Sequence, residues 1–450
     1  MSSHEDWAEE YQSALHLLRY PNGRRKAPGL RRNKKVTYFN SEEGTVDDID
    51  CFRSRVRAWL ASRYPPLDPS RDDDRGDVIA RAPHGHRSFV DGAVGLQRAL
   101  HAAGFTALAL PVEYGGQGLT REHDEVVAEE LARVESPSLR PLRIGLGLAL
   151  PTILAAANDE QKRRFVPKLV SGEEIWCQLF SEPDAGSDLV ALRTTAVRDG
   201  DSWIVSGQKV WSSLASDAAY GMLLARTDPA ATKPHAGITM FILPMDRPGV
   251  TVRPLVDIAG GRHFNEVFLE DVVLHDSDVM GEVNRGWQVA TGTLSGERSG
   301  YLGGSGAGRR RRQTQLAMNA AGLDHDAAAR QRVVDVAARE RLLELLVHRI
   351  EAGSVVNGNL AVGSLVKLAA GNLEQLAAEV VIDLRGAGGV AWECRDRGRN
   401  GDGDVDGDVD GDVASHGLNA SRQATIAGGT HQIQRNLIGE RVLGLPREAR

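Results

Sequence analysis

The chain has 450 residues, of which 41% are hydrophobic, and it carries a formal net charge of -7. These values predict a globular protein of two or three domains and give no global attraction to nucleic acid or to an anionic membrane. No apolar run is long enough to span a bilayer, and the acidic N-terminus lacks the apolar core of a secretory signal. The three cysteines are far apart and match no metal or disulfide spacing, so we expect no metal site and a reducing, cytoplasmic location.

Residues 1–46 are predicted to form an irregular tail with basic runs at 24–26 and 31–35. A tether to nucleic acid or to a membrane is one interpretation of these charges. A solvated tail is favoured, because neither interleaved aromatic residues nor an amphipathic period accompanies the basic residues. We therefore expect no nucleic-acid partner and no membrane insertion.

Helical periodicity begins near Asp47, where Phe52, Val56 and Leu60 recur at four-residue steps. Residues 47–172 are predicted to form a helical N-terminal domain. Its further helices are expected over 87–103, 120–134, 139–157 and 158–170, after a loop at 64–86 that is rich in Pro, Asp and Arg.

Period-two patterns replace the helical ones near residue 173 and predict a compact β-domain over 173–284. The expected strands are Thr194–Val197, Ser202–Val205, Met222–Ala225, Ile238–Leu243, Val250–Pro254 and Glu266–Val273. Helical periodicity returns at Gly286-Trp287, which predicts a helical domain over 285–450. The fold class is therefore α+β, with helices on either side of a β-domain.

Two segments of low complexity interrupt the last domain. Gly303–Arg312 ends in four consecutive arginines, and Arg395–Val413 alternates Asp with Gly. Alternating Asp and Gly suits a calcium loop, but the closing Glu of an EF-hand is missing at the required spacing. A disordered acidic insertion is the favoured interpretation of residues 395–413.

Two segments of the β-domain carry the chemistry. Residues 176–188 read WCQLFSEPDAGSD, and residues 203–213 read WIVSGQKVWSS. A flavin ring needs a flat apolar surface and hydrogen bonds to its edge, and its pyrophosphate needs small residues with free N–H groups. Ser181 suits the ring edge, the turn around Gly186 and Ser187 suits the phosphates, and Trp211 suits stacking. A β-turn beside a core tryptophan is the alternative for each segment alone, and their combination favours the flavin.

From about residue 47 to 450 the chain resembles the acyl-CoA dehydrogenases. Besides the two flavin segments, the resemblance rests on LPVEYGG at 110–116, DEQKRRF at 159–165, Gly286-Trp287, and IAGGTHQIQR at 426–435. It implies an N-terminal helical domain, a central β-barrel-like domain and a C-terminal four-helix bundle. It also implies dimers or tetramers that hold FAD partly across a subunit interface. The implied reaction removes hydrogen from the α and β carbons of an acyl-CoA, with an electron-transfer flavoprotein as the acceptor.

The resemblance assigns roles to particular residues. The positions that match flavin contacts in the β-domain are Gln178, Ser181, Gly186, Ser187, Trp211 and Ser213, and those in the C-terminal motif are Thr430 and Gln432. Asp383 and Gly386 lie in the stretch that meets the FAD of the neighbouring subunit.

The reaction needs a base for the α-proton of the thioester, and a buried carboxylate suits it because burial raises its proton affinity. Many family members place this Glu directly before the Gly-Thr of the C-terminal motif, where this chain has Gly428. Others carry it on the first long helix of the C-terminal domain, directly before an Arg. Glu297 matches that position and is the expected base, while Arg298 is expected to bind on the substrate side and to orient the helix or the flavin region. An ordinary exposed glutamate paired with an arginine is the alternative for Glu297.

The chain departs from the family pattern in a second place, because the Arg-x-x-Phe-Gly segment that reaches the adenine of FAD is missing around 300–335. These departures resemble a divergent actinobacterial branch, which often works as assemblies of two different subunits on sterol side-chain or other bulky acyl-CoA thioesters. Three functions follow: an FAD-dependent acyl-CoA dehydrogenase, a non-catalytic partner subunit of such an assembly, and an acyl-CoA oxidase-like flavoenzyme.

Overall fold

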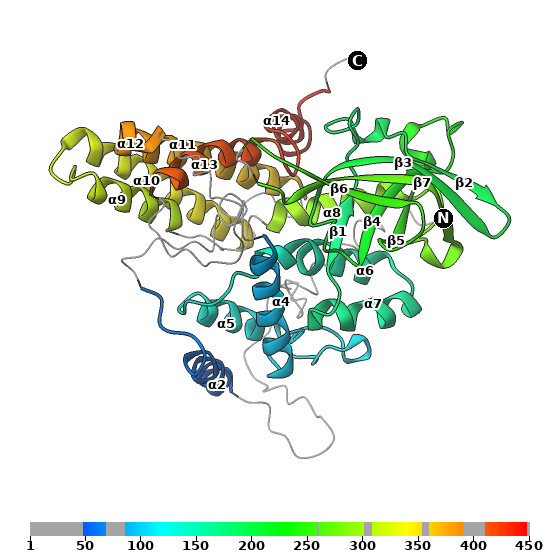
Figure 1. Ribbon diagram of the computed structural model, residues 1–450, viewed down its shortest axis with the longest axis horizontal. Coiled ribbons are helices and arrows are strands. Elements are labelled where there is room, and N and C mark those ends of the chain that lie inside the picture. Colours follow the sequence, from blue (N-terminus) through cyan, green and yellow to red (C-terminus); the bar gives the residue numbers. More distant parts are fainter. Residues whose placement is uncertain are drawn as a thin grey trace, which may run out of the picture.

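The computed structural model describes residues 48–68, 86–258, 261–300, 308–352, 360–390 and 410–447. Within these ranges, the side chains of 86, 296–300, 351, 360 and 410–413 are not described. The predicted tail, 1–46, and most of the acidic insertion lie outside the described residues. Figure 1 shows the N-terminal helices below, a curled sheet on the right and the C-terminal helices on the left, which confirms the α+β prediction.

The N-terminal helices lie close to their predicted places, with one exception. The predicted helix over 139–157 is three pieces, a 3-10 turn (Arg140–Leu142), a π-helix (η4, Gly145–Ala149) and α6 (Leu150–Ala156). Pro141 and Pro151 each lie in the first turn of a piece, where their missing N–H is tolerated, and they interrupt a single regular helix. The other elements are α2 (Ile49–Ala61), α4 (His86–Ala102), η2 (Val112–Tyr114), α5 (Arg121–Leu131) and α7 (Asp159–Ser171).

The middle of the chain forms one seven-stranded sheet in the order β1-β4-β2-β3-β7-β6, with β5 paired to β4. Most neighbours are antiparallel, but β1 runs parallel to β4, with Gln178 opposite Met222. The strands are β1 (Trp176–Leu179), β2 (Thr195–Asp199), β3 (Ser202–Ser213), β4 (Tyr220–Arg226), β5 (Ile238–Pro244), β6 (Val250–Leu255) and β7 (Phe264–His275). Short turns accompany them at η5 (Leu189–Ala191), η6 (Pro234–Gly237) and η7 (Asp276–Asp278).

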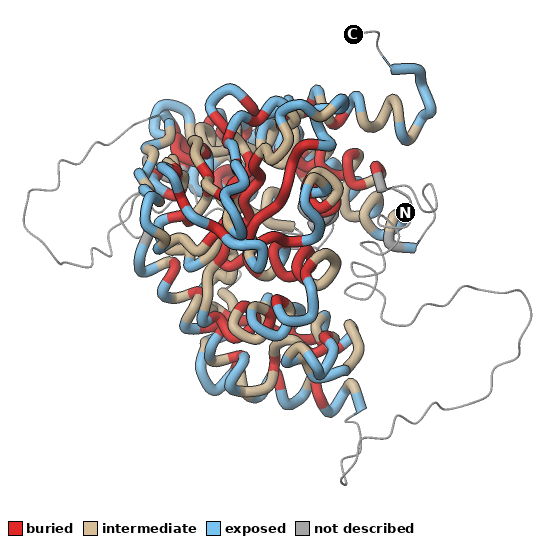
Figure 2. The backbone as a smooth tube through the Cα atoms, turned by 90° about the vertical axis from the view of Figure 1, so that its right-hand side faces the viewer, coloured by how far each residue is buried: buried red, intermediate tan, exposed pale blue. Residues whose placement is uncertain are grey.

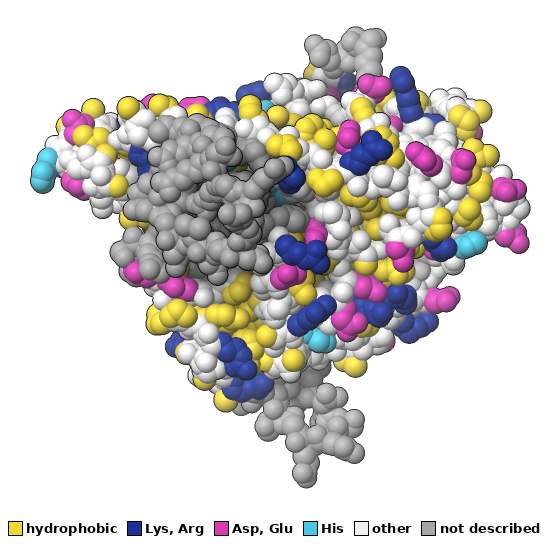
Figure 3. All heavy atoms as spheres, viewed as in Figure 1, with side chains coloured by type: hydrophobic (Ala, Val, Ile, Leu, Met, Phe, Trp, Pro, Cys, Tyr) yellow, Lys and Arg dark blue, Asp and Glu magenta, His cyan; other side chains and the backbone are white. Residues whose placement is uncertain are grey.

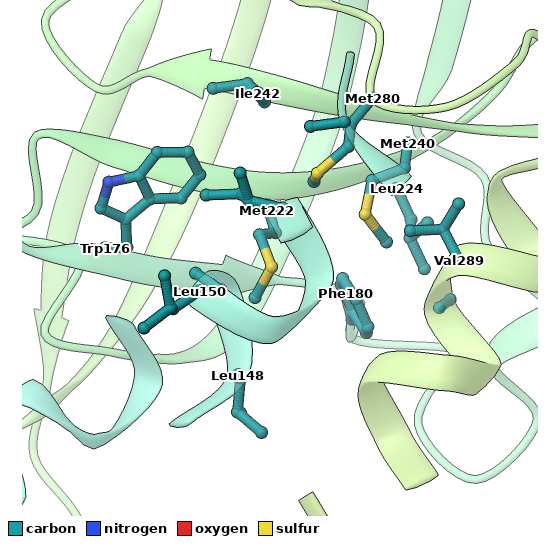
Figure 4. Packing of buried hydrophobic residues seen from close by; sticks show 14 of the residues in the cluster. Leu148, Leu150, Trp176, Phe180, Met222, Leu224, Met240, Ile242, Met280 and Val289 are labelled. Atoms are coloured by element: carbon teal, nitrogen blue, oxygen red, sulfur yellow. The ribbon is translucent and has the colours of Figure 1, made fainter. Parts of the chain in front are cut away.

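The largest core cluster joins the sheet to helices on both sides of it in the sequence. Figure 4 shows Trp176, Met222 and Met240 of the sheet facing Leu148 and Val289, which come from η4 and from α8 (Gly286–Gly300). The tube in Figure 2 is buried along the middle of the sheet and exposed around the loops. Burial of this cluster therefore fixes where α8 lies against the sheet.

The C-terminal helices pack around α11 (Gly363–Arg385), which contacts α9, α10, α13, α14 and α8. The other elements are α9 (Arg309–Ala320), α10 (Ala327–Glu351), η8 (Leu360–Val362), α12 (Ala387–Val390), α13 (Asp410–Ser421), η9 (Arg422–Thr425), α14 (His431–Leu437) and a π-helix, η10 (Ile438–Val442). Asp410 already begins α13, so the last residues of the predicted disordered insertion, 410–413, are helical and that part of the prediction is wrong.

The four arginines predicted to end a low-complexity segment instead form the first turn of α9. Arg309 and Arg310 bind the carboxylate of Glu374 at 2.7 Å, and the N–H groups of Arg310 and Arg311 donate to Glu340. Burial raises the pKa of Glu374, but the two guanidinium groups outweigh it and hold that pKa well below its usual range. This ion-pair cluster binds α9 to α10 and α11, so Arg309 and Arg310 belong to the folded structure.

Among the described residues, no helix is both long and apolar enough to cross a membrane. On the face shown in Figure 3, acidic and basic side chains are interspersed. The described part of that face therefore offers no extended surface of one charge.

Candidate functional site

The turn after β1 and the end of β3 lie against each other, which brings the two predicted flavin segments together. The N–H of Val210 donates to the carbonyl of Ser181 at 3.0 Å. This bond places Ser181 next to Val210, the residue directly before Trp211. Gln178 lies on β1 just before the turn. The two segments that the sequence analysis assigned to the flavin therefore lie next to each other.

A buried ion pair fixes this junction, and the sequence analysis missed it. The Lys209 ammonium is wholly buried and lies 2.7 Å from the Glu182 carboxylate and 3.2 Å from the carbonyl of Phe180. Glu182 also accepts the N–H groups of Arg193 and Thr194. The available signal was a lysine at an inward position of a strand, two residues before Trp211.

The pair is charged on both sides. Burial raises the pKa of Glu182, but the Lys209 charge and the three donors outweigh it, so that pKa lies below its usual value. Burial lowers the pKa of Lys209 to about 8, against the opposing effect of Glu182. Two desolvated charges with satisfied hydrogen bonds are a rigid link between turn and strand.

Trp211 stands out from the sheet. Its side chain is 58% exposed, and its backbone has φ 60°, a left-handed conformation that L-residues rarely adopt. The strand carries an irregularity between Lys209 and Ser212, and the Trp211 ring meets the edge of Phe264 with centroids 5.6 Å apart. Strain of this kind is typical of functional positions, where the surrounding structure enforces it.

The rest of the turn is open. Gly186 and Ser187 are exposed, and a Cβ at 186 would meet no atom within 4 Å. Packing within the described chain therefore does not require glycine at 186. A ligand that came close to the backbone here would require it, because a side chain would then be in the way. On β3, Ser213 is half-buried, and the neighbouring Ser212 hydroxyl is buried with no hydrogen-bond partner among the described residues.

The C-terminal motif forms a tight loop before α14. Gly428 and Gly429 both have positive φ, and the Gln434 amide donates to both of their carbonyls at 3.0 Å. Thr430 caps α14 by accepting the N–H of Ile433 at 3.3 Å, and Gln432 is exposed. The loop is therefore held by its own helix, with the two predicted flavin-contacting residues on either side of His431.

Glu297 and Arg298 lie in the last turn of α8, where side chains are outside the described part of the structure. The start of that helix is placed tightly. A Cβ at Gly286 would lie 2.3 Å from the N of Met240, and the buried hydroxyls of Thr152 and Thr293 bond at 2.9 Å. The backbone of α8 is therefore fixed against β5 and α6, and this fixes the path of the helix whose last turn contains Glu297.

Asp383 and Gly386 lie at the far end of α11, away from the sheet (Figure 1). A helix of 23 residues is about 34 Å long, so these residues are not brought to the turn of Ser181 within one chain. Asp383 pairs with Arg332 beside a cavity of about 410 Å³. The remaining residues that line this cavity are Glu379, Ile382, Leu418 and Arg422.

Comparison with known proteins decides the family. Models of the acyl-CoA dehydrogenase N-terminal, middle and C-terminal domains match residues 47–173, 177–272 and 284–443. The chain is 36% identical to "Acyl-CoA dehydrogenase IpdE1" of Mycobacterium tuberculosis over 418 residues, which are 90% of this chain and 100% of that protein. The chain belongs to the acyl-CoA dehydrogenase family. It is an oxidoreductase of that family, whose members are flavoproteins.

Further acyl-CoA dehydrogenases and solved structures are also similar to this chain. "Acyl-CoA dehydrogenase FadE34" of M. tuberculosis is 39% identical over 78% of this chain but only 46% of its own. Among solved structures, "Tcur3481-Tcur3483 steroid ACAD" has a TM-score of 0.70 at 26% identity over 89% of this chain and 98% of its own. "Crystal structure of the ChsE4-ChsE5 complex from Mycobacterium tuberculosis" has a TM-score of 0.64 at 27% identity, covering 92% of this chain and 100% of its own.

Proposed function

We propose that this acyl-CoA dehydrogenase uses FAD to convert an acyl-CoA thioester to the trans-2-enoyl-CoA. The observation that carries the proposal is the junction of the Ser181 turn with the end of β3. This junction contains the exposed and strained Trp211, the open turn at Gly186 and the half-buried Ser181. The buried ion pair of Lys209 and Glu182 holds the turn against the strand. A flat aromatic surface beside small residues with free N–H groups suits an isoalloxazine ring and its pyrophosphate.

Several residues are proposed to hold FAD. Gln178, Ser181 and Trp211 would hold the ring, Ser213 would lie beside Trp211, and Gly186 and Ser187 would approach the pyrophosphate. Thr430 and Gln432 would touch the flavin from the C-terminal loop. Asp383 and Gly386, at the distant end of α11, would contact FAD bound by the neighbouring subunit. When bound, FAD would supply the acceptor for the hydride that leaves the β carbon.

Glu297 is proposed as the base that takes the α-proton. Its support is the position in the last turn of α8, directly before Arg298, and the absence of a carboxylate at Gly428. A carboxylate at the buried end of an apolar chamber has a raised proton affinity, which suits removal of a weakly acidic C–H. Arg298 is proposed to bind on the substrate side and to orient this turn, without taking part in proton transfer.

The test is anaerobic visible spectroscopy of the purified protein. We expect a yellow protein whose flavin band is bleached by an acyl-CoA. Glu297→Gln should keep the flavin band but lose the bleaching, whereas Glu122→Gln on the exposed face of α5 should bleach like the wild type. Full bleaching by Glu297→Gln would remove Glu297 as the base, and a colourless protein under all conditions would remove the flavin assignment.

A second candidate is a partner subunit in an assembly of two different chains. Gly428 in the common position of the base favours it, and so does the missing Arg-x-x-Phe-Gly segment. The titles of two similar structures name paired chains, Tcur3481-Tcur3483 and ChsE4-ChsE5. Purification alone and after co-expression with a homologous subunit tests the assembly, because flavin colour that appears only in the mixture supports two different chains, and bleaching that survives Glu297→Gln in the mixture supports a non-catalytic role for this one.

The acyl group and the electron acceptor are also proposals. The structure titled "steroid ACAD" supports a bulky or sterol-derived acyl-CoA. An electron-transfer flavoprotein is proposed as the acceptor, and an acyl-CoA oxidase-like use of oxygen is the third candidate. Hydrogen peroxide formed in stoichiometric amounts with the enoyl-CoA would support the oxidase.

A further inference from the structure

One face of α11 holds the C-terminal loop through residues spaced one turn apart. Lys367 donates to the carbonyl of Ala424, and two turns further on Gln375 donates to the Thr425 hydroxyl at 3.3 Å. One more turn along, Glu379 pairs with Arg422 at 3.2 Å. Each four-residue step turns by about 40° around the helix axis, so these residues form a stripe that winds gradually around α11 and holds residues 422–425 along it.

Gly371 completes this row between Lys367 and Gln375 and makes a notch for His431. A Cβ at 371 would lie 2.5 Å from Nε2 of His431 and 2.6 Å from the carbonyl oxygen of Ala424. Gly371 has no positive φ, so close approach, and not backbone conformation, requires glycine at this position. The imidazole of His431 therefore sits against the helix backbone where any side chain at 371 would displace it.

The notch accepts a neutral imidazole and opposes a charged one. His431 is 7% exposed, and its Nε2 is buried without a hydrogen-bond partner among the described residues. The charged ring carries a proton on both nitrogens, so its Nε2–H would be a buried donor with nothing to bind, and a buried charge without a partner is strongly unfavourable. The loop is thus docked by the uncharged form of the ring.

The surrounding charges act in the same direction. Among the described side chains, two charged groups interact electrostatically with His431, and both are positive. They are Lys367 of α11, which is wholly buried, and Arg435 of α14, which is exposed. The acid on this face of α11, Glu379, is engaged with Arg422. Burial lowers the pKa of His431 below 6.5, and the two cations lower it further.

We propose that His431 is a positioning residue that holds residues 424–431 on α11 only as a neutral imidazole, so that the placement of Thr430 and Gln432 depends on pH. The docking of the loop stands on its contacts with α11 and does not depend on the flavin. Its consequence for the flavin rests on the proposed function, because Thr430 and Gln432 flank His431 and are the residues assigned to the flavin from this side.

The sign of the pH effect follows from linkage. A histidine whose pKa is lowered in the docked loop favours docking fully above its ordinary pKa of 6.5. As the pH falls below 6.5, the undocked loop takes up a proton that the docked loop rejects, and docking weakens until the docked pKa is reached. One proton limits the change in the docking equilibrium to about tenfold per pH unit.

Hydrogen exchange of the full-length protein tests the docking directly, without dependence on flavin. Protection factors of the 424–431 amides, corrected for intrinsic exchange, should be constant from pH 8 to 7 and should fall by up to about tenfold per unit below 6.5. His431→Gln, which cannot be protonated, should give protection that does not change with pH. His235→Gln, on an exposed turn, should behave as the wild type.

Two results would overturn the proposal: constant protection of the loop in the wild type, or the same fall in His431→Gln as in the wild type. Gly371→Ala should lower protection of the loop at every pH although alanine favours the helix, and unchanged protection in that variant would also contradict the notch. In the wild type, the fraction of FAD released, measured by FAD fluorescence, should rise over the same pH range in which protection of the 424–431 amides falls. If no flavin is bound at all, the proposed function fails while the exchange measurement still decides the role of His431.

Discussion

Replacing Lys209 by methionine tests how the candidate flavin site is held together. The variant removes the cation and leaves the Glu182 carboxylate, which is 7% exposed, without its 2.7 Å partner. Removing one member of a buried ion pair costs roughly 3–5 kcal/mol, because the other charge stays desolvated. Glu182 keeps the N–H groups of Arg193 and Thr194, so we expect a loss in the free energy of unfolding at the lower end, about 3 kcal/mol.

Urea unfolding followed by tryptophan fluorescence measures this loss, and the buried rings of Trp176 and Trp203 in this sheet contribute to the signal. The double variant Glu182→Gln with Lys209→Met removes both charges, and it should recover part of the loss of Lys209→Met alone. Lys233→Met, at an exposed position, is the matched control and should stay within about 0.5 kcal/mol of the wild type.

The reasoning would be refuted by a loss below about 1 kcal/mol in Lys209→Met, since an isolated buried carboxylate cannot be that well tolerated. It would also be refuted if the double variant were less stable than Lys209→Met. Lys209 binds the residues on either side of Ser181 and lies two residues before Trp211. Under conditions in which both variants are folded, we therefore expect Lys209→Met to lose flavin and the Lys233→Met control to keep it.

Three further predictions follow from local geometry. Gly95→Ala should stabilise α4 by about 0.5–1 kcal/mol in thermal or urea unfolding, because the residue is exposed inside a helix with no atom within 4 Å of its Cβ; destabilisation would contradict this. Burial raises the pKa of Asp124 to about 6, so the native state holds a proton that the unfolded state releases above the ordinary aspartate pKa of 3.8, and the free energy of unfolding should fall as pH rises from 4 to 6. Asp124→Asn should remove that fall and gain at most about 3 kcal/mol at pH 7, and an unchanged pH profile would refute the assignment. Burial raises the pKa of the Cys177 thiol to about 12, so in peptide-resolved alkylation of the native protein exposed Cys51 should react and Cys177 should not, and equal rates would contradict the burial.

The helices and most strands were predictable because their signals are local. Four-residue recurrence of Phe52, Val56 and Leu60 marks α2, and all three side chains are buried. The strand β1 was not among the predicted strands, because it has only four residues and three of them are buried, so no alternation is visible. Its parallel pairing with β4, more than 40 residues later, is a non-local contact that no window of sequence reports.

Charged residues in the core were the least predictable part of the structure. Four arginines in a row after a glycine-rich stretch have the composition of a solvated segment, yet Arg309 and Arg310 pair with Glu374, which lies more than 60 residues away, and Arg312 donates to the carbonyl of Asp68. Lys209 and Lys367 are also wholly buried, each paired with groups from another element. Composition assigns such residues to the surface by default, and only tertiary contacts reverse that assignment.

The glycine at 428 changes what the C-terminal loop contributes. With no carboxylate there, the loop offers backbone groups, Thr430 and Gln432, and its position is set by α11 through Lys367 and by Gln434. The proposed base lies instead on α8, whose start is fixed against β5 at Gly286. Proton removal and flavin contact would then depend on two different helices. Displacing the loop, as in Gly371→Ala, should therefore weaken flavin binding without moving the backbone that carries Glu297, and equal disruption of α8 in hydrogen exchange would contradict that separation.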